Sequence, residues 1–326
     1  MTLPKIGITI GDPGGIGPEI VLKAFSGNFV LPSADYILFG SSRVLQEEEK
    51  TVGLCLPLGS LKAKKISKTG TLAFREVDIA LRKIRKGVPS PENGLASFRF
   101  FEAAIAEARQ EVLQGVVTAP VSKQSWALAG VNWRGHTDFL GQFYPEIIMA
   151  FWSDKIKVAL FSHHVSLREA LRKVTRENLR SFFLRLSQSL ARMRPGGFAF
   201  LVSGLNPHAG EGGLLGGEEI EEIIPAIEEA RKSGLRISGP YPPDVVFRKA
   251  LGQEDKIVIA LYHDQGLIAF KLETFDKGVN LSVGLPFVRT SPDHGTAFDI
   301  AGKNAASPLS LIEAIKLAVE LTPAPL

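Results

Sequence analysis

Short apolar runs alternate with longer helical patterns along this chain, and this alternation constrains its fold more than any other feature. Amphipathic helical patterns include residues 92–113 and 218–232. Strands that are buried on both faces have continuous apolar sequences, and parallel strands need crossover connections, which are usually helical. We therefore predict an α/β fold with mainly parallel sheets, covered by helices on both faces. The apolar runs are residues 6–10, 36–39, 115–118, 158–161, 198–202 and 257–261.

Size and composition narrow the class of protein further. The chain has 326 residues, which is more than one hydrophobic core usually serves, so two lobes are expected. The net charge of +4 is small and scattered, which argues against a nucleic-acid-binding face. No apolar run approaches the length of a membrane helix, and no signal-peptide pattern is present. We expect a soluble cytoplasmic protein that binds neither nucleic acid nor membrane.

The single cysteine, Cys55, limits the metal chemistry that is available. It excludes an internal disulfide framework and a metal site built from several cysteines. A transition-metal site would therefore have to use histidine and carboxylate ligands.

The first candidate site is the glycine-rich segment at residues 11–19 (GDPGGIGPE), which follows an apolar run and opens a helix. Backbone N–H groups in that position can contact an anion. The spacing fits neither a Walker A loop nor the Rossmann fingerprint. A tight turn that uses the conformational freedom of glycine is the alternative interpretation.

Histidines follow three of the predicted strands. His163 and His164 come after residues 158–161, and His208 and His263 follow the next two runs. Because the ends of parallel strands can meet at one edge of a sheet, three imidazoles could converge there and hold a divalent ion. Three separate hydrogen-bonded loop histidines would give the same sequence pattern, and the residues alone leave both interpretations open.

Other polar residues lie near apolar segments and could contact an anionic ligand. For each cation, a side chain that extends from the edge of the core to solvent is the alternative. Asp244 is either a proton-transfer or supporting residue, or part of a surface turn. Residues 292–302 form a turn before a short apolar segment, and physical chemistry alone does not identify its ligand. The anion-binding candidates are His136, Thr137, Lys271, Asn280 and Arg289.

Five motifs in this order resemble the 4-hydroxythreonine-4-phosphate dehydrogenase family, NAD-dependent enzymes of pyridoxal phosphate biosynthesis. The first and last motifs also resemble, more loosely, segments of isocitrate and isopropylmalate dehydrogenases. The resemblance implies their two-lobed, non-Rossmann α/β/α fold. The five motifs are residues 11–20 (GDPGGIGPEI), 134–137 (RGHT), 205–211 (LNPHAGE), 262–266 (YHDQG) and 290–297 (TSPDHGTA).

The resemblance also implies the domain organisation and the cofactors. Residues 1–130 and 285–326 would form one lobe with the cofactor loop, and residues 131–284 would carry the metal ligands. The active site would lie in the cleft between the lobes and be shared between the subunits of a homodimer. NAD is the implied cofactor, with NADP left open, together with one divalent ion: zinc, magnesium or cobalt.

The resemblance assigns roles to individual residues of this chain. His164, His208 and His263 would bind the metal ion, with His164 chosen over His163 from the residues that follow it. The five anion-binding candidates would contact the substrate. The cofactor would contact Asp293, His294, Gly295 and Asp299, together with Gly11 and Asp12.

The implied reaction is the oxidation of 4-phosphooxy-L-threonine at C3, followed by decarboxylation to 3-amino-1-hydroxyacetone phosphate. This reaction belongs to pyridoxine 5'-phosphate biosynthesis. A dehydrogenase for threonate or erythronate 4-phosphate is the alternative within the same chemistry. A protein that only binds a phosphorylated metabolite is the alternative outside it.

Overall fold

A computed structural model describes residues 2–56, 64–67, 70–81, 83–194, 196–274 and 277–322. The chain forms two compact units. Unit 1 contains residues 1–145 and 285–326, and unit 2 contains residues 146–284. Both are α/β units, and none of their described helices is long and apolar enough to cross a membrane.

The strands of unit 1 have the order β3-β4-β2-β1-β5-β12. Every neighbouring pair is parallel except β3 and β4. The apolar sequence of β1 places Ile6 and Ile8 in the core, and both are fully buried. The strands are β1 (Lys5–Thr9), β2 (Asp35–Gly40), β3 (Lys64–Ser67), β4 (Gly70–Glu76), β5 (Gly115–Thr118) and β12 (Val288–Pro292).

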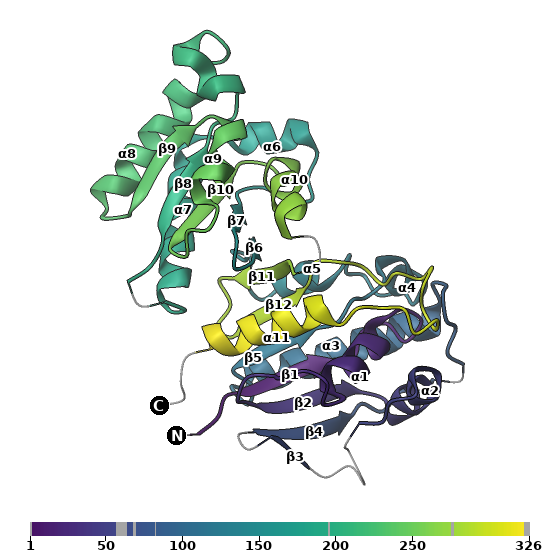
Figure 1. Ribbon diagram of the computed structural model, residues 1–326. Coiled ribbons are helices and arrows are strands. Elements are labelled where there is room, and N and C mark those ends of the chain that lie inside the picture. The colour runs from purple at the N-terminus through teal and green to yellow at the C-terminus, as the bar shows by residue number, and fades with distance from the viewer. Residues whose placement is uncertain are drawn as a thin grey trace. The chain divides into compact units, whose positions relative to one another are not determined.

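Helices cover the strands of unit 1 (Figure 1). Helix α11 packs on β5 and β12, and α1 packs on α11. The long helix α3 packs on β1, β2 and β5. Its N-terminus is capped by the hydroxyl of Ser90, which accepts the N–H of Asn93 at 3.3 Å. The helices are α1 (Gly17–Phe25), α2 (Ser42–Val52), α3 (Pro91–Arg109), α4 (Lys123–Leu128), α5 (His136–Gly141) and α11 (Leu309–Leu321).

The strands of unit 2 have the order β11-β6-β7-β10-β8-β9. β6 is antiparallel to both of its neighbours, whereas β7, β10, β8 and β9 are parallel. The strands are β6 (Ile148–Trp152), β7 (Lys157–Leu160), β8 (Ala199–Ser203), β9 (Ile237–Tyr241), β10 (Lys256–Ala260) and β11 (Val279–Val283).

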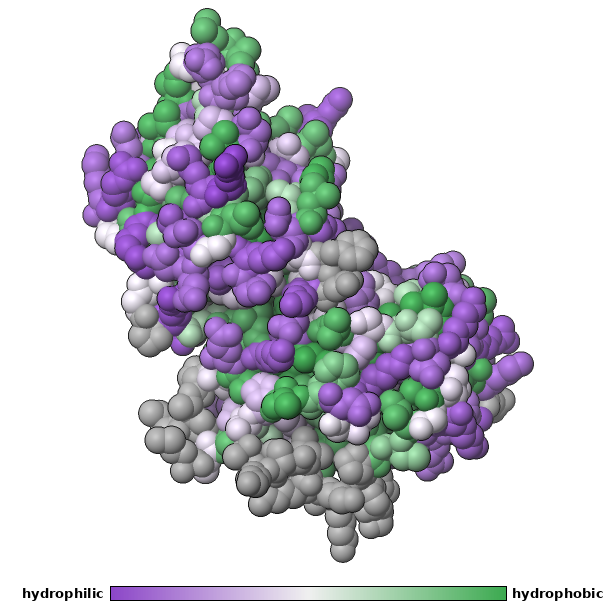
Figure 2. Space-filling view, in the orientation of Figure 1, coloured by the Kyte–Doolittle hydropathy of each residue, from purple (hydrophilic) through white to green (hydrophobic). Residues whose placement is uncertain are grey.

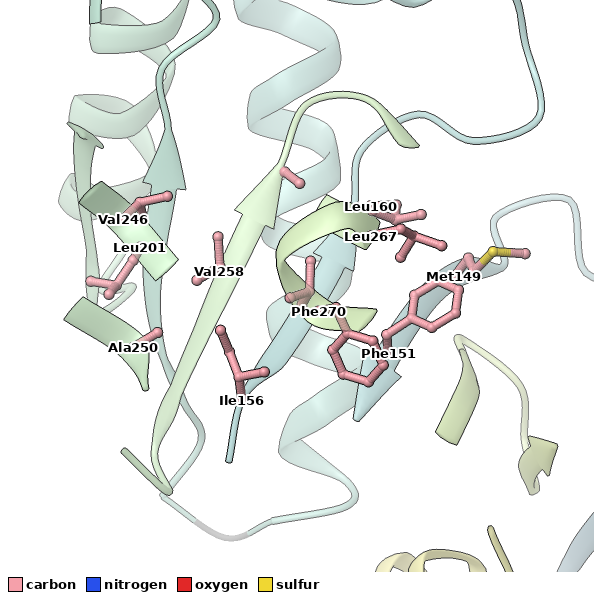
Figure 3. Packing of buried hydrophobic residues seen from close by; sticks show 12 residues of the cluster. Met149, Phe151, Ile156, Leu160, Leu201, Val246, Ala250, Val258, Leu267 and Phe270 are labelled. Atoms are coloured by element: carbon pink, nitrogen blue, oxygen red, sulfur yellow. The ribbon is translucent and has the colours of Figure 1, made fainter. Parts of the chain in front are cut away.

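Alternate side chains of these strands build one core of unit 2 against α9 and α10 (Figure 3). Phe270 of α10 is fully buried, and its ring centroid lies 5.5 Å from that of Phe151. The remaining helical segments are α6 (Leu167–Lys173), α7 (Arg176–Ala191), the turn η2 (Pro207–Gly213), η3 (Glu219–Ile223), α8 (Ile224–Lys232), α9 (Pro243–Ala250) and α10 (His263–Thr274).

The segment between β8 and α8 carries exposed apolar side chains. Leu214 is 83% exposed, and Leu215 and Ile220 are also exposed. Helix α10 adds Leu272, which is 81% exposed. Figure 2 shows hydrophobic residues among hydrophilic ones at the surface of unit 2.

The prediction of an α/β fold with mainly parallel strands is confirmed. The antiparallel strands β6 and β11 were not predicted. Residues 131–145, which the family resemblance placed in the second lobe, lie in unit 1. There Phe139 of α5 packs edge-on against Phe98 and Phe101 of α3.

Candidate active site

Two histidines meet where β7 and β10 end. The N–H of Phe161 donates to the carbonyl of Ala260 at 2.8 Å, and the hydroxyl of Ser162 donates to the carbonyl of Leu261 at 2.8 Å. These bonds continue the pairing of the two strands beyond their ends. The rings of His164 and His263 consequently lie with their centroids 5.7 Å apart.

The His263 ring is oriented by the next residue in the chain. Its Nδ1 lies 2.7 Å from Oδ1 of Asp264. A carboxylate accepts this hydrogen bond, so in the neutral ring Nδ1 carries the proton and Nε2 presents a lone pair. Metal-binding histidines are held in this way by a carboxylate on the second ring nitrogen.

The third predicted ligand, His208, lies in the unusual turn η2. Five consecutive residues, 208–212, have positive φ values between 43° and 80°. A left-handed conformation costs roughly 1–2 kcal/mol for each non-glycine residue, so other contacts must hold the turn in place. His208 is exposed on this turn.

The histidine pair has donor chemistry that suits a divalent metal ion. Imidazole nitrogens suit zinc and similar transition ions, and the His164–His263 pair provides two of them side by side. Within the described residues of one chain, no three His, Cys, Asp or Glu side chains form a group that could hold an ion. The pair therefore fits a divalent ion in its chemistry, and His208 does not complete the set within a single chain.

His163 lies beside this pair. Burial lowers its pKa, and the nearby charges of His263 and Lys173 lower it further. Its Nδ1 is buried without a hydrogen-bond partner. The sequence assigned His163 no role, and the structure keeps it neutral.

A buried arginine defines the polar centre of unit 1. Arg289 on β12 is 2% exposed, and burial lowers its pKa to about 9, so the guanidinium stays charged at neutral pH. Its Nη2 donates to Oγ1 of Thr118 at 2.5 Å and to Nδ1 of His136 at 3.0 Å. Two elements, β5 and α5, thus hold one edge of the guanidinium.

The contact with Arg289 fixes the tautomer of His136. A guanidinium only donates, so Nδ1 must accept and the ring proton must sit on Nε2. Burial lowers the pKa of His136 well below its usual value, and the positive charges of Arg289 and Lys123 lower it further. Nε2 is buried without a partner. His136 therefore presents an unused N–H donor beside a buried cation, which suits an anionic ligand.

The lowered pKa of His136 predicts how stability depends on pH. Below about pH 6.5 the unfolded chain binds a proton at this residue before the folded chain does. The free energy of unfolding should therefore fall as the pH falls from about 6.5 towards the folded pKa, by at most about 1.4 kcal/mol per pH unit. Chemical denaturation of the wild type and of His136→Asn at several pH values measures this. A difference between the two proteins that does not change with pH would contradict the assignment.

The other predicted substrate contacts lie on both units. Thr137 is in the first turn of α5, in unit 1. Lys271 is exposed in the last turn of α10, and Asn280 is on β11, both in unit 2. Oδ1 of Asn280 is buried without a hydrogen-bond partner, so it too is an unused polar group.

The glycine-rich segment forms a tight turn that meets the predicted cofactor segment. Gly11 has a φ of 75°, and a Cβ there would lie 2.5 Å from the carbonyl oxygen of Pro120. Asp12 is fully buried and accepts the N–H of Gly14 at 2.8 Å, while burial raises its pKa. The N–H of Ile16 donates to the carbonyl of Thr296 at 3.0 Å. The first and last motifs of the sequence therefore lie side by side.

The remaining predicted cofactor contacts follow β12. Within this stretch His294, Gly295 and Asp299 are exposed and Asp293 is half-buried. Asp244 is exposed in the first turn of α9, in unit 2. These groups are accessible to a ligand, and their roles remain predictions.

Sequence reasoning assigned no role to two buried residues of unit 2, Glu219 and Gln265. Glu219 is 1% exposed and binds the segment that leads into η2. Gln265 links the end of β10 to Gly204 after β8. Gln265 could have been identified from the sequence, because it lies inside the YHDQG motif. Glu219 could not, because it is one of several glutamates in a helical pattern.

The architecture, two α/β units with mainly parallel strands, also occurs in another solved structure. A β-decarboxylating dehydrogenase from Thermococcus kodakarensis shares the fold, with a TM-score of 0.50 at 16% identity over 96% of this chain and 82% of that one. The family model for the pyridoxal phosphate biosynthetic protein PdxA matches residues 33–318. The chain belongs to the PdxA family.

Relatives agree with this assignment over nearly the whole chain. The 4-hydroxythreonine-4-phosphate dehydrogenase of Aquifex aeolicus is 40% identical over 325 residues, covering 97% of this chain and 98% of that protein. The crystal structure of an enzyme of the same name from Klebsiella pneumoniae matches with a TM-score of 0.85 at 33% identity, covering 98% and 100%. A Fusobacterium nucleatum protein with the provisional name D-threonate 4-phosphate dehydrogenase is 36% identical, covering 98% and 97%. The predicted family is confirmed, and the chain is an oxidoreductase.

Proposed function

We propose that this protein oxidises 4-phosphooxy-L-threonine at C3 with NAD. The product then loses CO₂ to give 3-amino-1-hydroxyacetone phosphate for pyridoxine 5'-phosphate synthesis. The observation that carries this proposal is the 40% identity over 325 residues to a 4-hydroxythreonine-4-phosphate dehydrogenase. The buried cation and the oriented imidazole pair support it, because such a substrate carries two anionic groups and a hydroxyl to be oxidised.

The chain's own residues bind and orient the substrate in this proposal. Arg289 and the Nε2–H of His136 hold one anionic group, and the hydroxyl of Thr137 adds a donor from the same helix. Lys271 and Asn280 contribute contacts from unit 2. The Arg289 guanidinium and the His136 ring are already hydrogen-bonded to each other, so substrate binding should cost little side-chain entropy at these two residues.

A divalent ion on His164, His208 and His263 would lower the pKa of the C3 hydroxyl and favour its oxidation. Three neutral imidazoles favour zinc or cobalt over magnesium, which prefers oxygen ligands. The accessible stretch at 293–299, which the glycine-rich turn supports through the hydrogen bond from Ile16 to Thr296, would hold NAD, with NADP also acceptable. Asp244 would assist proton transfer or support a ligand.

We also propose that the active site is completed in a homodimer. Exposed apolar side chains follow each of the three histidine segments: Leu167 after His164, Leu214 after His208, and Ile268 after His263. Covering these side chains with a second copy would place the histidines at a subunit interface. Mixing two inactive variants, His136→Ala and His263→Ala, should restore activity in mixed dimers if the site is shared.

The proposed location is the cytoplasm. The single cysteine, Cys55, leaves no internal disulfide, as is usual for cytoplasmic proteins.

A substrate panel tests the proposed reaction. Purified protein loaded with Zn²⁺ or Co²⁺ should reduce NAD⁺ with 4-phosphooxy-L-threonine, and the formation of NADH is followed by absorbance. The second candidate is a threonate or erythronate 4-phosphate dehydrogenase, which the 36–37% identity to proteins named for D-threonate 4-phosphate favours. Oxidation of threonate 4-phosphate without turnover of 4-phosphooxy-L-threonine would overturn the first candidate in favour of the second.

A further inference from the structure

The turn that carries His208 is wrapped around a buried carboxylate. Oε1 of Glu219 accepts the N–H groups of Leu205 and Asn206 at 2.7 and 2.8 Å, and Oε2 accepts Nδ2 of Asn206 at 2.8 Å. A buried carboxylate is costly unless its oxygens are hydrogen-bonded, and here three donors satisfy them. The carboxylate therefore replaces the regular hydrogen bonds that residues 205–206 lack.

Two glycines show how tightly this segment encloses Glu219. A Cβ on Gly204 would lie 3.3 Å from Oε1, and a Cβ on Gly210 would lie 2.8 Å from Oε2. Gly210 also has a φ of 80°, which other residues rarely adopt. The left-handed course of η2 is thus built around the carboxylate.

A second buried side chain connects this segment to His263. Oε1 of Gln265 accepts the N–H of Leu261 at 2.7 Å, and its Nε2 donates to the carbonyl of Gly204 at 2.8 Å. Gly204 begins the segment that Glu219 holds, and Leu261 precedes His263 by two residues. One amide therefore connects the end of β8 to the end of β10.

We propose that Glu219 is a positioning residue for the metal site, acting through the turn that presents His208, and that Gln265 ties this turn to the His263 segment. The proposal rests on the proposed function, because it takes His208 as a ligand. Glu219 does not touch the metal ion or the substrate. It fixes the backbone from which the imidazole projects, and losing that support frees a strained turn to relax away from its binding geometry.

Metal affinity measured by chelator competition with Co²⁺ tests this proposal on the full-length protein. Glu219→Ala should weaken Co²⁺ binding by about 10- to 100-fold, the range found when supporting residues of metal sites are removed. Glu219→Gln keeps one oxygen for the two backbone donors and should recover part of the affinity. The visible spectrum of bound Co²⁺, which reports ligand geometry, should change in Glu219→Ala and return towards wild type in Glu219→Gln.

Glu19 provides a matched control in unit 1. It is fully buried and accepts Nζ of Lys23 and the N–H of Ala306, each at 2.8 Å. Glu19→Gln should leave Co²⁺ affinity and spectrum unchanged. If Glu219→Ala does not fold, Asn206→Ala serves instead. It removes the amide that donates to Oε2 of Glu219 and should also weaken Co²⁺ binding.

The outcomes separate this proposal from the proposed function. Wild-type affinity and spectrum in Glu219→Ala, or in Asn206→Ala where Glu219→Ala does not fold, would overturn the positioning role while leaving the metal site intact. A wild-type protein that binds no Co²⁺ would instead overturn the metal site itself.

Discussion

Replacing His263 by alanine should remove the divalent ion and lower kcat/KM by at least about 10³-fold, which corresponds to about 4 kcal/mol of transition-state stabilisation. The reason is geometric, because His263 is one of the two imidazoles that the strand ends bring together and its ring is already oriented by Asp264. Elemental analysis of the purified variant gives the metal content, and steady-state NADH formation gives kcat/KM.

Two variants nearby serve as graded comparisons. Asp264→Asn keeps His263 but weakens its orientation, so metal affinity should fall about 10- to 100-fold rather than vanish. His163→Gln changes the neighbouring histidine, which has no assigned role, and should keep the metal ion. Full metal content in His263→Ala would show that this residue is not a ligand.

Replacing Arg289 by methionine should lower kcat/KM by about 10²- to 10³-fold, because a substrate anion then enters a site without its charged donor. The same change leaves Oγ1 of Thr118 and Nδ1 of His136 without the donor that they share, which costs about 1–3 kcal/mol for a buried group left unsatisfied. The free energy of unfolding should therefore fall as well, while the protein that remains folded shows the loss of kcat/KM. Steady-state kinetics and chemical denaturation of the same preparation measure both quantities.

Arg289→Lys separates charge from geometry. Lysine keeps the positive charge but cannot reproduce the planar donor arrangement that contacts Thr118 and His136, so an intermediate activity is expected. Arg99→Met changes an exposed arginine on α3 and should leave kcat/KM unchanged. Wild-type kcat/KM in Arg289→Met would remove this residue from the substrate site.

The strands that the sequence predicts best are those with continuous apolar side chains. Residues 158–161 and 257–261 were predicted within one residue of β7 and β10, because strands buried on both faces have continuous apolar sequences. β6 (IMAFW) has the same pattern and was nevertheless missed. β12, with the sequence VRTSP, was missed because its buried positions include Arg289. A strand that carries functional polar groups breaks the hydrophobic pattern by which strands are identified.

For the site, the sequence predicted the segments but not the contacts that hold them. The position of histidines after strands predicted that His164 and His263 could meet, and their rings are adjacent. The left-handed turn at 208–212 could not be predicted, because its conformation depends on Glu219, which lies seven or more residues further along the chain. The tautomer of His136 likewise depends on Arg289, which is 153 residues away in the sequence.

The burial of Arg289 has a consequence for substrate discrimination. A buried charge is little screened by water, so it interacts strongly with an arriving anion. An analogue that lacks this anionic group would lose that interaction and bind more weakly. Deleting the anion from the ligand and deleting the cation from β12 remove the same interaction, so their effects should be strongly non-additive, and comparing analogues without the phosphate or without the carboxylate would identify which group Arg289 binds.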